Sequence, residues 1–86
     1  MQYIIEEQYG IELHTFQVIV DNSIMGFTLR FETKPDVMYL PEHFYKNMCE
    51  FYAIDNIDKY RGVLVRSYTK DKIKLISDDK VMEFNI

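Results

Sequence analysis

The 86-residue sequence predicts an α+β fold. A mostly antiparallel sheet of about five strands is expected to pack on one amphipathic helix, with a short helix at the N-terminus. Three observations lead to this fold class. Apolar and polar residues alternate over residues 25–32, which is typical of a half-buried strand. A wide apolar stripe at helical spacing follows Pro41, and β-rich runs separated by turn residues follow residue 62.

The first third of the chain is expected to form one short helix and two strands. Residues 2–9 favour a helix that ends at Gly10, because glycine commonly follows the last helical residue. A strand is the alternative for this segment. Residues 13–20 favour a strand, and turn-forming residues 21–23 lead into the alternating strand at 25–32.

The remaining elements follow from breaks in the chain and from periodicity. Residues 37–40 are expected to form a short extended piece between two prolines. Residues 41–54 favour an amphipathic helix, because a proline suits its first turn and Phe44, Met48 and Phe51 recur at i, i+4 and i+7. Three strands are expected at residues 63–68, 72–76 and 81–85.

A small OB-like barrel is the alternative architecture. If residues 37–40 form a full third strand, the element order matches that of such a barrel. The extra C-terminal strand and the presence of only three glycines argue against a tightly closed barrel. In the favoured fold, Phe27, Leu29 and Phe31 are core residues that face the helix at residues 41–54.

Composition excludes several classes of protein. A chain of this length predicts one globular domain over residues 1–86, and one cysteine excludes an internal disulfide framework. Cys49 falls in the middle of an expected helix, six residues from His43. We therefore expect Cys49 to be a small buried apolar residue and not a nucleophile. No pair of metal ligands has a typical spacing. We therefore expect no enzymatic activity, no catalytic residues, no cofactor and no metal site.

The location and origin of the chain are also suggested by its sequence. No apolar run is long enough to span a bilayer, and the first 13 residues contain no Lys or Arg, unlike a signal peptide. A cytoplasmic protein without a membrane partner is therefore expected. Phe, Ile, Asn, Lys and Tyr account for 34 residues and Gly, Ala, Arg and Pro for only 9. This bias is typical of AT-rich coding, which indicates a low-GC bacterium, its plasmid or its phage.

Charge is distributed unevenly along the chain. Residues 1–58 carry a net charge of −7 and residues 59–86 a net charge of +3. Within the basic part, cations alternate with aromatic residues, and a hairpin over residues 59–74 is expected to place most of them on one outer surface. This candidate partner-binding set consists of Lys59, Arg61, Arg66, Tyr68, Lys70, Lys72 and Lys74.

A short chain without catalytic motifs favours a protein that works by occupying a surface. We expect a small non-enzymatic protein-binding module. In its sharper form, it is an anti-CRISPR-like inhibitor from a phage or mobile element that covers a host nuclease or defence complex. One alternative is a small nucleic-acid-binding or regulatory protein that uses the basic hairpin at residues 59–74. Another is a homo-oligomeric structural subunit.

Overall fold

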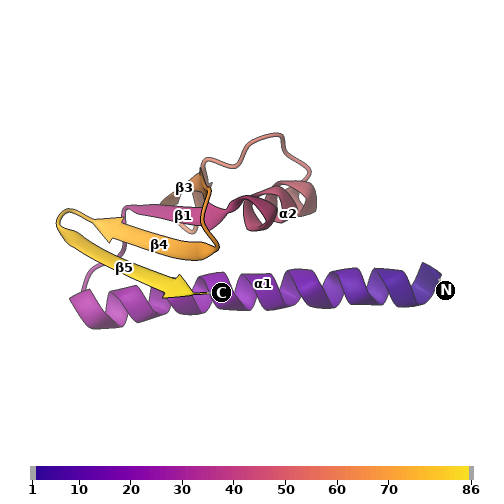
Figure 1. Cartoon of the computed structure of the whole chain (residues 1–86), viewed down its shortest axis with the longest axis horizontal. Coiled ribbons are helices and arrows are strands. Elements are labelled where there is room, and N and C mark those ends of the chain that lie inside the picture. Colours follow the sequence, from indigo (N-terminus) through magenta and orange to yellow (C-terminus); the bar gives the residue numbers. More distant parts are fainter. Residues whose placement is uncertain (1, 86) are drawn as a thin grey trace.

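The structure is a computed structural model that describes the backbone of residues 2–85 and the side chains of residues 17–85. It contains two helices and a five-stranded sheet, which confirms the α+β fold class (Figure 1). The elements are α1 (Gln2–Phe31), β1 (Val37–Pro41), α2 (Glu42–Tyr52), β2 (Lys59–Tyr60), β3 (Val63–Tyr68), β4 (Lys72–Ser77) and β5 (Lys80–Asn85).

The sheet has the strand order β2-β3-β1-β4-β5. The central strand β1 is parallel to β3 and antiparallel to β4, and the two remaining pairs are antiparallel. The sheet is open, with β2 and β5 at its edges, so the barrel alternative is wrong. The expected helix at residues 41–54 and the three C-terminal strands match α2, β3, β4 and β5 closely.

One face of the sheet, here called the inner face, is buried under both helices. α1 supplies Val20 and Phe27 to this core, and α2 supplies Phe44 and Met48. Cys49 is also buried, as the sequence predicts. Phe51 is 50% exposed, so its expected place in the core is wrong. The inner-face residues buried in this cluster are Met38, Leu40, Tyr60, Val63, Val65, Ile73 and Leu75.

A single 30-residue helix, α1, replaces the short helix and two strands expected in the first third of the chain. The prediction fails because alternation over residues 25–31 also fits two i, i+4 ladders on opposite sides of a helix. Phe27 and Phe31 turn toward the core, whereas Met25 and Leu29 are 59% and 76% exposed. Leu29 is therefore not a core residue.

Neither glycine of α1 ends the helix. Gly10 lies in its interior. A glycine there lowers the stability of the helix by about 1 kcal/mol, which is too little to end a helix that continues on both sides of it. Gly26 allows close packing, because a Cβ atom there would lie 3.3 Å from Cζ of Phe84 in β5. The helix ends where Glu32 adopts a left-handed conformation with φ of 56°, and the Glu32 amide donates to the Thr28 carbonyl at 2.8 Å.

Truncation of two neighbouring residues in α1 tests its orientation. We expect Phe27→Ala to lower the free energy of unfolding by about 3–5 kcal/mol, because a fully buried ring is removed. Leu29→Ala is the matched control and should change it by less than about 0.5 kcal/mol. Urea denaturation of both variants measures the difference. Equal losses would contradict the helix and support the strand, in which the two residues share one face.

Candidate binding surface

The other face of the sheet, here called the outer sheet face, points away from both helices. Within residues 2–85 neither helix covers it, because the apolar sides of α1 and α2 pack with the inner face. The strand register sets its side chains in rows across the strands. The apolar row consists of Leu64, Val37, Ile76 and Val81. The charged row consists of Arg66, Tyr39, Lys74 and Glu83.

The cations of the outer sheet face are partly neutralised. Arg66 Nη1 lies 3.6 Å from Asp58 Oδ1, and Lys72 Nζ lies 3.7 Å from Glu83 Oε2. All four of these side chains are substantially exposed, so both pairs are weak and can exchange for contacts with a partner. Among the described residues, no carboxylate lies within ion-pair distance of Lys74, in the middle of the charged row.

Two tyrosines add an aromatic patch beside these cations. The rings of Tyr39 in β1 and Tyr68 in β3 lie with their centroids 5.6 Å apart and their planes at 51°. Both residues are half-buried. Because the rings pack on each other in a tilted pair, they form one aromatic surface and not two separate platforms.

The structure brings together five of the seven residues that the sequence singles out. Lys59, Arg66, Tyr68, Lys72 and Lys74 have the parity of the outer sheet face. They do not form the expected hairpin, because β1 lies between β3 and β4. The predicted common face is nevertheless present, since strand parity alone determines the side on which a residue lies.

The other two members of that set lie elsewhere. Arg61 is in the turn between β2 and β3 and points back to α1, where it pairs with Asp21. Lys70 lies in the loop between β3 and β4 and is exposed. A cation in a turn can point to either side of the sheet, so strand parity did not determine the place of either residue.

The central position of Tyr39 was missed in the sequence analysis. Residues 37–40 gave a usable signal, because they combine β-branched, aromatic and aliphatic residues between two prolines. No local sequence pattern indicated where these residues lie in the sheet. β1 pairs with β3 and β4, which follow more than twenty residues later in the chain, so only long-range pairing places Tyr39 among the cations.

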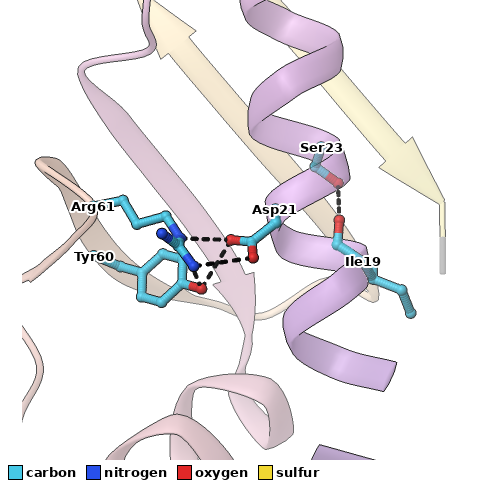
Figure 2. A network of polar contacts seen from close by, with 5 residues as sticks. All are labelled: Ile19, Asp21, Ser23, Tyr60 and Arg61. Carbon is cyan, nitrogen blue, oxygen red and sulfur yellow. Dashed lines mark hydrogen bonds and ion pairs between the residues drawn. The ribbon is translucent and has the colours of Figure 1, made fainter. Parts of the chain in front are cut away.

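A second polar cluster lies on the opposite side of the sheet and ties α1 to β2 (Figure 2). The Tyr60 hydroxyl donates to Asp21 Oδ1 at 2.8 Å. Arg61 donates from Nε to the same oxygen at 2.9 Å and from Nη2 to Oδ2 at 3.3 Å. Nearby, the buried Ser23 hydroxyl donates to the Ile19 carbonyl within α1 at 2.8 Å, so it needs no other partner.

Burial is the main cause that raises the pKa of Tyr60 above its ordinary value. Hydrogen bonding to Tyr60 and Asp21 raises the pKa of Arg61, so both groups keep their protons at neutral pH. The cluster therefore combines a neutral phenol with the ion pair between Arg61 and Asp21. It is suited to holding the helix against the edge of the sheet.

Other kinds of site find little support in the described part of the chain. No three His, Cys, Asp or Glu side chains there lie close enough together to hold a metal ion. No described helix combines the length and the apolar character needed to cross a membrane. Comparisons of the chain with protein-family models, curated protein sequences and solved structures find no match.

The pH dependence of stability tests the Tyr60 hydrogen bond. Because the pKa of Tyr60 in the folded protein is raised above 10.0, the unfolded chain loses the phenolic proton first as the pH rises. The stabilisation is complete below about pH 10 and is lost as the pH passes the folded-state pKa. We expect Tyr60→Phe to cost about 1–2 kcal/mol at neutral pH and less above pH 10. Urea denaturation between about pH 7 and pH 11 measures this cost, and a cost that stays constant would contradict the assignment.

Proposed function

We propose that the protein is a small non-enzymatic protein-binding module whose outer sheet face covers an acidic surface of a protein partner. The observation that supports this most is an uncovered sheet on which the apolar row lies directly beside the charged row. Burial of the apolar row by a partner removes apolar surface from water, which favours binding. The adjacent cations orient the partner on this face.

The chemistry of this face matches that of protein interfaces. Interface cores are enriched in aromatic residues, methionine and arginine, and the rim is polar and exposed to solvent. Here Tyr39 lies at the centre of the face beside Arg66, and its ring packs on that of Tyr68 at the end of β3. The lysines Lys59 and Lys72 lie toward the outside, on β2 and β4. An acidic partner surface would release Arg66 and Lys72 from their exposed internal carboxylates.

Nucleic-acid binding is less favoured by the same face. The net charge of −4 opposes the approach of a polyanion. The two tyrosine rings also pack on each other, which reduces the area available for base stacking.

The proposed setting is the bacterial cytoplasm. The AT-rich composition supports a phage or mobile element of a low-GC host as the source. A host nuclease or defence complex is then the proposed target, inhibited by occlusion of an acidic patch in the manner of anti-CRISPR proteins.

Reversal of one central charge tests the proposal. We expect Lys74→Glu to slow association with the partner about tenfold at low salt, because rim and face cations steer encounter with an acidic surface. Lys46→Glu makes the same charge change at an exposed position of α2 and is the matched control. The partner is captured from a low-GC bacterial lysate and purified. Its association rates with the wild type and both variants are then measured by surface plasmon resonance.

Gel-shift assays provide the opposing outcome. For the wild type we expect no salt-sensitive shift of duplex or single-stranded DNA or RNA below about 10 µM protein. A shift at low micromolar protein that is removed by Lys74→Glu but kept by Lys46→Glu would contradict the proposal and support nucleic-acid binding. Equal association rates for the two variants would contradict the outer sheet face as the binding surface.

A further inference from the structure

β5 forms one edge of the sheet, and among the described residues its backbone pairs only with β4. Ser77 and Lys80 flank a turn of two residues, so they form the hydrogen-bonded pair that closes this hairpin. Hydrogen-bonded and non-hydrogen-bonded pairs alternate along an antiparallel ladder. The backbone N–H and C=O groups of Lys80, Met82 and Phe84 therefore point to β4.

The backbone groups of the alternate residues of β5 point away from the sheet. Val81, Glu83 and Asn85 lie in the non-hydrogen-bonded pairs with β4, so their N–H and C=O groups are directed to the free edge. No other described residue forms a hydrogen bond with these groups. Such a row of donors and acceptors is a template for one kind of backbone, an extended chain.

The two edges of the sheet differ in how they are protected from pairing. Natural edge strands are kept from pairing by shortness, proline, bulges or charge. β2 contains only two residues, so it offers little to pair with. β5 contains six residues without a proline, and its uninterrupted register with β4 has no bulge. Its charged side chains are one Lys and one Glu, which leave the strand without net charge.

We propose that β5 binds an extended segment of a protein partner, which pairs antiparallel with it as a sixth strand. In this mode of recognition, main-chain hydrogen bonds provide the affinity and alternate side chains provide the specificity. The inference concerns the edge of the sheet, so it does not depend on the outer sheet face as a binding surface.

The side chains of β5 determine which segment fits. On the inner face, Met82 and Phe84 are half-buried and pack against the core. Directly opposite residues of an antiparallel pair lie on the same face, so the segment places apolar residues beside these two. On the outer sheet face, Glu83 is partly exposed and lies 3.7 Å from Lys72. A Lys or Arg of the segment opposite Glu83 complements its charge.

A second copy of β5 is a poorer occupant of this edge. The antiparallel register that uses all three outward-directed residues sets Glu83 directly opposite Glu83 of the other copy, and like charges at opposite positions destabilise a sheet. Two β5 strands also join at most six residues on each side, whereas stable interfaces have about 20–30 residues on each side. A larger partner can extend its contact from the edge onto the outer sheet face, where Val81 is 48% exposed.

Proline substitution at one position of β5 tests the edge. Glu83→Pro removes the outward N–H and leaves the bonds to β4 intact, because proline is tolerated where the N–H of an edge strand faces solvent. Glu83→Ala is the matched control, since it removes the side chain and keeps that N–H. The probe is a phage-displayed library of random peptides of about twelve residues, selected on the wild type. Fluorescence anisotropy then measures the dissociation constants of the selected peptides after synthesis.

The selected peptides should alternate apolar and polar residues and carry a Lys or Arg at a polar position. Glu83→Pro should weaken their binding at least about tenfold, because it removes a main-chain bond and places a ring against the added strand. Glu83→Ala should weaken it about fivefold at most, which is the loss of one cross-strand charge pair. Peptides that bind Glu83→Pro as tightly as the wild type, or a library that yields no binder, would overturn the proposal.

Two measurements separate edge pairing from misfolding. In urea denaturation, Glu83→Pro should destabilise the fold much less than Met82→Pro, which removes a bond to β4. Equal destabilisation would show that residue 83 does not face the free edge and would overturn the proposal. N-methylation of every second peptide residue should abolish binding in one phase and change it less than about threefold in the other, because alternate N–H groups face β5. Equal effects in both phases would also overturn it.

The oligomeric state distinguishes a partner segment from a second copy. Analytical ultracentrifugation of the wild type at up to about 200 µM should show a species of the 10.4 kDa chain mass, since paired β5 strands alone form too small an interface. A dimer that Glu83→Pro dissociates and Glu83→Ala does not would show that a second copy occupies the edge, and would overturn the proposal.

Discussion

The insertion of β1 between β3 and β4 is the contact on which the rest of the structure depends. It joins two antiparallel ribbons, β2–β3 and β4–β5, into one five-stranded sheet. On the inner face, Met38 and Leu40 are fully buried and connect the packing of both ribbons with both helices. On the outer sheet face, Tyr39 links the cations of β3 with those of β4. Without β1 there is neither a continuous core nor a continuous outer sheet face.

Local sequence patterns predicted the strands in the second half of the chain well, but they did not predict how these strands pair. Strand limits in β3, β4 and β5 follow from β-branched residues and turn chemistry, which act within a few residues. The burial of Cys49 follows from its place on the apolar side of α2. The position of β1 depends on a parallel pairing with β3, and such long-range contacts leave no trace in local periodicity.

The failure over α1 has a specific physical cause. The period of two over residues 25–32 fits a half-buried strand, but it fits equally well a helix with apolar residues on two opposite sides. Here the alternating residues split into Phe27 and Phe31 on one side of a helix and Met25 and Leu29 on the other. The alternation therefore reports a helix that has two apolar sides. Asp21 accepts hydrogen bonds from Tyr60 and Arg61 that tie α1 to the sheet, and no sequence pattern linked residues so far apart.

The two apolar surfaces of the molecule lie on opposite sides of its core. The outer sheet face points away from the helices, and Val18, Met25 and Leu29 lie on the side of α1 that points away from the sheet. The core separates these two surfaces, so substitutions on one should act independently of substitutions on the other. An effect on association that is confined to variants of one surface can therefore be assigned to that surface.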